Sequence, residues 1–324
     1  MPRNYTVDVF RILGALCVVA LHAPLDSLPN EAALLIRLGS RWAVPFFFLA
    51  SGFFFGAGKQ ERPTVSAAKQ LSFLLSIFLI ANIIYGLFFL VDQDPKTLFS
   101  PSLVGLLVGQ SGHLWYISAS IFGYLLLQYA VNRYSDRVLL LTGSAVLIGI
   151  LAGVAYSTLV HATLPYEVGH LFTSIPFLWG GYLLARHRVI TSYFTVTRSV
   201  LLIGLGFGLE LVEAIGLYKL TGASPHNQEL LLGTTLMAFG ILCLALTWQT
   251  PTENRFAAWG RRYSLQIYLY HALVLAVLYH IFHLESVSPY LGWISPIIGF
   301  FVTLGLLKAL EQLSPRAFKV LSGS

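Results

Sequence analysis

The sequence predicts an all-α, polytopic integral membrane protein with about ten transmembrane helices. Of its 324 residues, 56% are apolar and only 10% are charged, whereas soluble domains have about 25% charged residues. The mean hydropathy is +0.73, and apolar runs of about 20 residues, the length that spans a bilayer, recur along the chain. A soluble core of this size would alternate apolar and polar positions instead.

Ten spans follow from these runs, and each is long enough to cross the hydrocarbon core. They cover about 7–24, 40–57, 69–91, 113–131, 138–160, 168–187, 197–219, 229–248, 263–283 and 290–312. A short apolar piece at 102–110 is expected at the membrane interface or as a re-entrant segment. The longest polar interruptions are too short for a soluble domain. We therefore expect residues 1–324 to form a single transmembrane domain.

The basic residues indicate the orientation of the chain. An even number of spans places both termini on one side of the membrane, and 15 of the 20 lysines and arginines then fall on that side, with Arg11 inside a span. The opposite side receives four, which are Arg37, Arg41, Lys96 and Lys219. Because cytoplasmic loops carry the excess of Lys and Arg, both termini are predicted to be cytoplasmic.

Composition also argues against several other classes of protein. The net charge of +6 is scattered through short loops without a basic face, so no nucleic-acid partner is expected. Cys17 and Cys243 both lie in apolar spans, which indicates neither a disulfide framework nor a metal site. Asp8, Arg11 and the missing small-x-small pattern argue against a cleaved signal peptide.

The first span carries the most informative pattern. Ionisable groups inside a membrane helix are costly and tend to be functional, and this span holds Asp8, Arg11 and His22. Eleven residues separate Arg11 from His22, so the two lie within roughly 20° on one helix face and about 16 Å apart along the axis. This spacing suits a long anionic molecule that lies lengthwise in the protein, with its reactive end at His22.

Four motifs resemble those of the type-3 membrane acyltransferase family. The first is Arg11, ten residues and His22, and the second is the run V-P-F-F-F-L-A-S-G that begins at Val44. The others are His113-Leu-Trp115-Tyr116 and Ser264-Leu-Gln-Ile-Tyr268-Leu-Tyr-His271. The sequence differs from the family at two places: Lys69-Gln-Leu-Ser72 stands where many members have R-x-x-R, and Ser120 where many have glutamate.

The resemblance implies an acyl-CoA-dependent O-acyltransferase of the bacterial inner membrane, similar to single-domain enzymes that acetylate surface polysaccharides. Acetyl-CoA would be the donor, and a carbohydrate or lipid-linked sugar would be the acceptor on the outer side. No metal is implied. The alternative is a transporter or exporter of a small solute or lipid-linked sugar, although transporters usually show internal repeats that are missing here. The sequence does not indicate the oligomeric state.

His22 and Asp26 are the first catalytic candidates. Imidazole is largely neutral and nucleophilic near pH 7, so His22 fits a general base or a transient acyl carrier. The alternative is an interfacial histidine at the end of the span, because Pro24 follows closely. Asp26 either orients the imidazole as a carboxylate partner or is a solvated loop acid.

Cations near the cytoplasmic ends of the spans are candidates for the donor site. Arg11 fits a clamp on the phosphates of coenzyme A, or it is a snorkelling arginine paired with Asp8, which would also fix its side chain. Lys69 and the Arg261-Arg262 pair either add to this cationic mouth or serve membrane orientation alone.

Two later segments complete the predicted site. His113, Trp115 and Tyr116 open the fourth span, either as a wall of the transfer chamber with His113 as an oxyanion donor or as part of an aromatic belt. Ser264, Tyr268 and His271 share one helix face at i, i+4 and i+7, as a polar stripe towards the donor or as interhelical hydrogen-bonding groups. His280-x-x-His283 lacks the further ligands of a metal site.

Overall fold

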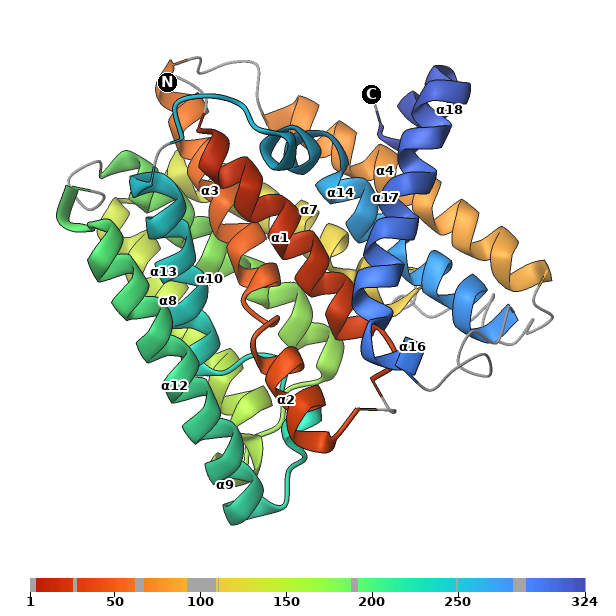
Figure 1. The fold of residues 1–324 in the computed structure, drawn as a ribbon. Helices are drawn as coiled ribbons and strands as arrows, with labels where there is room; N and C mark the ends of the chain where they lie inside the picture. The colour runs from red at the N-terminus through yellow and green to blue at the C-terminus, as the bar shows by residue number, and fades with distance from the viewer. Residues whose placement is uncertain are drawn as a thin grey trace.

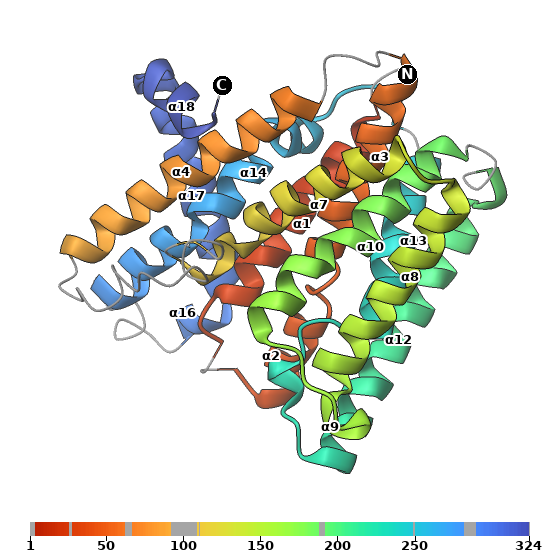
Figure 2. The ribbon, with the colours of Figure 1, turned by 180° about the vertical axis from the view of Figure 1, so that it is seen from behind.

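The computed structural model describes residues 4–25, 28–61, 67–91, 109, 111–187, 192–248, 250–281 and 290–323. These residues form helices and connecting segments, with no strand among them. The predicted all-α architecture is confirmed. Both views show the start of α1 and the short α18 at the same end of the bundle (Figures 1 and 2), as an even number of spans requires.

Each predicted span corresponds to a helix. The helices are α1 (Tyr5–His22), α3 (Ala43–Glu61), α4 (Ala67–Val91), α7 (Trp115–Val131), α8 (Asp136–Ile150), α10 (Tyr166–Arg186), α12 (Val196–Thr221), α13 (Leu232–Thr247), α14 (Arg255–Ala276) and α17 (Ser295–Leu313). In the described ranges, eight helical stretches are long and apolar enough to cross a membrane. Two predicted spans fall outside this set, because α13 has only 16 residues and α14 carries many polar side chains.

Short elements depart from the predicted pattern. The interruption at 24–39 contains a nine-residue helix, α2 (Asn30–Leu38), which begins after Pro29, a residue that suits a helix start. A π-helical turn, Leu151–Ala155, and α9 (Ser157–Val160) end the fifth span. A second π-helical turn, Val277–Ile281, follows α14, and α16 (Tyr290–Trp293) precedes α17. α18 (Pro315–Leu321) follows α17. Most of the predicted piece at 102–110 lies outside the described residues.

The central helices pack tightly because glycines let their backbones meet. A Cβ on Gly52 of α3 would lie 2.0 Å from the Leu178 carbonyl oxygen of α10, and a Cβ on Gly181 would lie 2.0 Å from the Leu49 oxygen. A Cβ on Gly260 of α14 would lie 1.8 Å from the Asp8 carbonyl oxygen. Such close contacts are how membrane helices gain packing energy, and here they fix α1 against α14 and α3 against α10.

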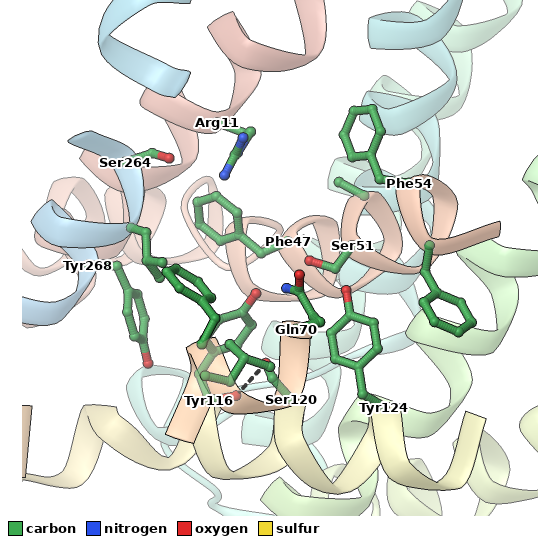
Figure 3. Close-up of a pocket in the computed structure, with 15 residues that line it drawn as sticks. Arg11, Phe47, Ser51, Phe54, Gln70, Tyr116, Ser120, Tyr124, Ser264 and Tyr268 are labelled. Carbon is green, nitrogen blue, oxygen red and sulfur yellow. Dashed lines mark hydrogen bonds between the residues drawn. The ribbon is translucent and has the colours of Figure 1, made fainter. Parts of the chain in front are cut away.

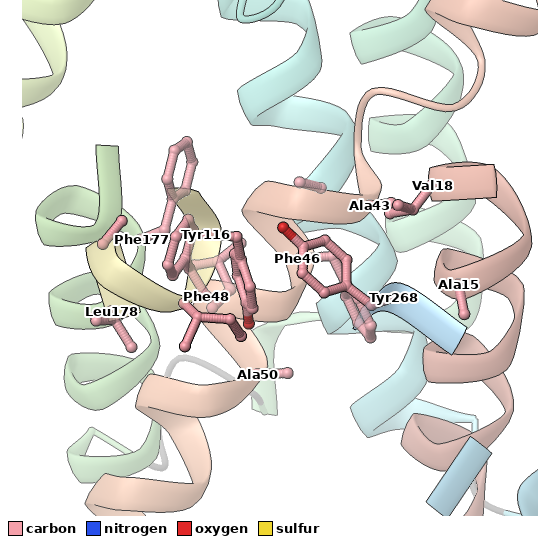
Figure 4. Close-up of a cluster of buried hydrophobic side chains, with 14 of the residues drawn as sticks. Ala15, Val18, Ala43, Phe46, Phe48, Ala50, Tyr116, Phe177, Leu178 and Tyr268 are labelled. Atoms are coloured by element: carbon pink, nitrogen blue, oxygen red, sulfur yellow. The ribbon is translucent and has the colours of Figure 1, made fainter. Parts of the chain in front are cut away.

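The core lies between α1, α3, α7, α10 and α14, and Figure 4 shows part of it around Phe46 and Phe48. Its outer helices are α4, α8, α12 and α17, which expose rows of leucine, isoleucine and phenylalanine. In the best spanning window, 72% of α10 is buried but only 22% of α4 and of α12. The central helices are therefore shielded by the outer ones, and the outer ones present the surface that lipid would cover.

Candidate functional site

Two cavities lie at opposite ends of α1. The first, here the Arg11 cavity, has a volume of about 270 Å³ and is lined by the N-terminal half of α1 and by α3, α4, α7 and α14. The second, the His22 cavity, has about 400 Å³ and lies where α1 ends and α3, α7 and α10 begin. The unbroken α1 helix sets Arg11 and His22 about 16 Å apart, at 1.5 Å per residue.

The Arg11 cavity combines one cation with hydroxyl groups on an apolar wall. The Arg11 guanidinium extends into it (Figure 3), and its Nη1 lies 3.4 Å from Oδ1 of the buried Asp8. Ser264, Tyr268 and Tyr116, which the sequence assigns to a donor site, line the same cavity, together with Ser120, the residue at the family's glutamate position. The fixed charge and the hydroxyls can hold phosphate oxygens, while the aromatic wall can hold an apolar arm.

Lys69 does not join this group. Its side chain is exposed at the start of α4, and the neighbouring Gln70 lines the cavity instead. Successive residues on a helix point about 100° apart, so only one of the two can face inward.

His22 presents a free ring nitrogen to its cavity. Its Nδ1 lies 2.9 Å from the Val18 carbonyl oxygen, and because a carbonyl only accepts, Nδ1 carries the hydrogen. In the neutral ring Nε2 then holds a lone pair, and no described residue hydrogen-bonds to it. The side chain is exposed where it lines the cavity, so Nε2 is available to take a proton or to attack a carbonyl.

His113 and His271 surround the His22 ring. The ring centroid of His22 lies 5.0 Å from that of His271 and 6.0 Å from that of His113. Both nitrogens of His113 are engaged: Nε2 lies 3.1 Å from the Leu269 carbonyl oxygen and Nδ1 lies 2.9 Å from Oγ of Ser111. His113 therefore lines the cavity without a free N–H for an oxyanion in this conformation.

His271 is fully buried and lines neither cavity. Its Nδ1 lies 2.8 Å from the Tyr268 carbonyl oxygen, and its Nε2 has no hydrogen-bond partner in the part of the chain that the structure describes. The described residues contain no group of three or more ligand side chains suited to a metal ion.

Aromatic rings separate the two cavities. Tyr268 lines the Arg11 cavity, and its hydroxyl donates a hydrogen bond to the carbonyl of His113, which lines the His22 cavity. The Tyr268 ring also packs 5.0 Å from Tyr116 and 5.9 Å from the His113 ring, centroid to centroid. Neither of these two cavities contains both Arg11 and His22, so the expected passage between the two residues is not formed by either cavity.

The His22 cavity holds polar residues that the sequence motifs do not point to. Arg37, Arg41, His170 and Glu229 line it. Trp115, expected at the donor site, lies here instead, with its ring centroid 4.3 Å from that of His170. The sequence did contain one indication of the two arginines: Arg37 and Arg41 are two of only four basic residues on the predicted outer side, where few are expected. Asp26 and His283 lie outside the described residues, as does the His280 side chain.

The comparison with protein families identifies the family of the chain. Residues 4–307 match the sequence model of a family described as "Acyltransferase domain". The chain belongs to the type-3 acyltransferase family. Its acyltransferase domain thus takes in both cavities and every helix that lines them.

The similar curated proteins are longer than this chain and are named as racemases. A serine/alanine racemase of Enterococcus gallinarum is 31% identical over 306 residues, which are 85% of this chain and 41% of the racemase. An amino-acid racemase of Enterococcus faecalis is 24% identical over 308 residues, 86% of this chain and 42% of that protein. The chain therefore spans less than half the length of these relatives. No solved structure matches this chain.

Proposed function

We propose that this protein is a transmembrane O-acyltransferase that moves an acyl group, acetyl by default, from acyl-CoA to an acceptor hydroxyl. The observation that carries the proposal is the free Nε2 of His22, which faces a cavity at the opposite end of α1 from the Arg11 cavity. Family membership supports acyl transfer. The racemase names do not argue for racemisation, because the shared region is the one that the family describes as an acyltransferase domain.

The donor would occupy the Arg11 cavity. Its phosphates would bind the Arg11 guanidinium, which Asp8 holds in place, and its pantetheine arm would extend along α1 towards His22. The acyl end must pass the Tyr116 and Tyr268 rings, so donor binding is expected to displace them. The separation of about 16 Å between Arg11 and His22 matches the length of such an extended arm.

Transfer would then be a single acid–base cycle on His22. The acceptor hydroxyl attacks the thioester carbon while its proton passes to Nε2. The carbon–sulfur bond breaks as the ester carbon–oxygen bond forms, and the imidazolium returns the proton to the departing thiolate. Atoms and charge balance without a metal. His271 and His113, packed around the ring, would hold its orientation.

The acceptor would enter the His22 cavity from the outer side of the bacterial inner membrane. With the N-terminus cytoplasmic, as the charge distribution predicts, the Arg11 cavity faces the cytoplasm, where acyl-CoA is made. A hydroxyl of a cell-surface glycan or a lipid-linked sugar is the proposed acceptor. Only the acyl group then crosses the protein, so no alternating-access movement is needed.

Reconstituted protein can test this directly. Radiolabelled acetyl-CoA is enclosed in proteoliposomes, and a bacterial cell-envelope glycan fraction is added outside. We expect alkali-labile label on the external glycan and stoichiometric release of free coenzyme A inside. Label that stays on acetyl-CoA would contradict acyl transfer, and movement of a solute or lipid-linked sugar without thioester loss would support the transporter alternative.

A further inference from the structure

The His22 cavity contains two arginines at the end of the bundle that is otherwise poor in basic residues. Arg37 comes from α2 and Arg41 from the segment between α2 and α3. Orientation by the positive-inside rule would place such residues at the opposite end. Their charges therefore call for an explanation within the cavity.

Arg41 is buried without a full set of partners. It is only 5% exposed, and its Nη2 donates to the carbonyl oxygens of Pro225 and His226 at 2.8 and 3.2 Å. Its Nη1 is buried and has no hydrogen-bond partner among the described residues. No described acid lies within 4.0 Å of the guanidinium; the carboxylates of Glu210 and Glu229 act on it from further away, and of the two only Glu229 lines the cavity. A buried guanidinium with an unmade hydrogen bond is costly unless a ligand completes it.

Arg37 lies directly beside the reactive histidine. Its Nη1 donates to the carbonyl oxygen of Leu21, the residue before His22, at 3.2 Å. This bond fixes the guanidinium at the C-terminal end of α1 and leaves further N–H groups for the cavity, because a guanidinium has five. An anion held here would lie next to the Nε2 atom that takes the acceptor proton.

The lining acid of the cavity is already neutralised. Nε2 of His170 lies 2.5 Å from Oε2 of Glu229, and Nδ1 of His170 lies 2.8 Å from the Tyr166 carbonyl oxygen, which only accepts. One proton must therefore lie between Nε2 and the carboxylate, and the pair is neutral whichever atom holds it. The charges of Arg37 and Arg41 thus remain for a ligand.

We infer that Arg37 and Arg41 bind an anionic oxygen group, carboxylate or phosphate, of the molecule that occupies the His22 cavity. If the proposed acyl transfer holds, the acceptor is an acidic or phosphorylated sugar rather than a neutral one. Paired guanidinium groups bind the planar or tetrahedral oxygens of such groups through charge-assisted hydrogen bonds. The anion would anchor the sugar and place a neighbouring hydroxyl at His22.

Thermal unfolding of the purified full-length protein tests anion binding without any acyl donor. Glucose 1-phosphate, glucuronate, inorganic phosphate and neutral glucose are titrated at constant ionic strength. We expect the anions, but not glucose, to raise the unfolding midpoint, because a ligand that binds only the folded state stabilises it. The larger response, phosphate or carboxylate, identifies the group. R133Q is the matched control, because Arg133 lines neither cavity, and R11Q, which removes the cation of the other cavity, identifies any response that comes from there.

Two variants probe the arginines. R37Q removes the less buried of the two arginines. R41K keeps the positive charge and a donor to the backbone carbonyls but loses the paired N–H groups of the guanidinium. Each is expected to weaken the apparent anion affinity at least tenfold, which is about 1.4 kcal/mol, while R133Q keeps the response. Equal responses in wild type, R37Q and R41K, a response lost in R11Q alone, or no response to any anion would overturn the inference. Anion binding without label transfer in proteoliposomes would refute the acyltransferase proposal and leave this site standing.

Discussion

Replacing His22 by asparagine separates the chemistry of this residue from its structural role. The Nδ1–H of His22 donates to the Val18 carbonyl, and the amide nitrogen of asparagine can occupy nearly the same position. The variant therefore keeps the hydrogen bond, which contributes about 1 kcal/mol to stability. It has no counterpart to Nε2, the atom that faces the cavity, so H22N should fold normally and lack the base.

The expected loss follows from that one atom. General acid–base catalysis by a positioned side chain contributes about 10²–10⁴-fold in rate, which corresponds to roughly 2.7–5.5 kcal/mol of activation free energy. His113 cannot substitute, because both of its nitrogens are hydrogen-bonded within the protein. We expect a drop of at least about 100-fold in kcat, with little change in KM for acetyl-CoA.

The assay is initial-rate transfer of label from acetyl-CoA to the glycan fraction, with the unfolding midpoint measured on the same preparation. His161 gives a matched control, because it is exposed in a connecting segment at φ 52°, a conformation that asparagine adopts readily. H161N should leave the rate and the midpoint unchanged. If H22N kept more than a tenth of the wild-type rate, or lost activity only through a large fall in its midpoint, the assigned role would be wrong.

Three further predictions concern other parts of the protein. R11Q should raise KM for acetyl-CoA about tenfold or more with a smaller effect on kcat, because it removes a binding contact far from the reacting atoms. The control R133Q, in a connecting segment, should change neither value. Equal KM values for R11Q and wild type would contradict the role of Arg11 as a phosphate clamp. G181A should lower the unfolding midpoint by many degrees, since the new Cβ would lie 2.0 Å from the Leu49 carbonyl oxygen. G180A is the control, because its new Cβ would lie at an ordinary 3.5 Å from Cδ2 of Leu49. Similar midpoints for the two variants would argue against this packing. Burial raises the pKa of Glu229, in the segment before α13, but the hydrogen bond and charge of His170, the hydrogen bond of Tyr166 and the charge of Arg41 outweigh it and hold that pKa below 4.5. The carboxylate therefore stabilises the protein above pH 4.5, and the excess stability of wild type over E229Q should shrink as the pH falls below that value; an excess that is constant between pH 7 and 4 would exclude the interaction.

Hydropathy was sufficient to find the bundle but not its polar centre. The apolar runs predicted a helix at every span, because burial in lipid demands a continuous apolar segment with internal hydrogen bonds. The same measure gave no sign of α2, whose nine residues lie in a polar interruption. Helix spacing grouped Ser264, Tyr268 and His271 as one stripe, and all three are buried side chains of α14. Seven residues advance a helix by about 10 Å, however, which takes His271 past Tyr268 to the ring of His22.

The remaining site residues depend on contacts that no local spacing encodes. His170 and Glu229 are 59 residues apart and meet only because α10 packs near the segment before α13. Arg37 and Arg41 entered the sequence argument as markers of membrane orientation. Their position in the cavity follows from α2 folding back over the end of α1, which the bond from Arg37 to Leu21 records.

The layer of aromatic rings between the two cavities has a consequence for the membrane potential of the cell. A water-filled hole through the bundle would let protons run down a membrane potential that is worth about 2.3 kcal/mol per charge for each 100 mV. The Tyr268 ring, whose hydroxyl donates to the His113 carbonyl, lies where such a hole would have to pass. On the proposed route the hydroxyl proton leaves with the thiol, and a neutral group replaces a neutral group on each side. Turnover would then be electrically silent, and the decoration of the envelope would draw on thioester energy alone.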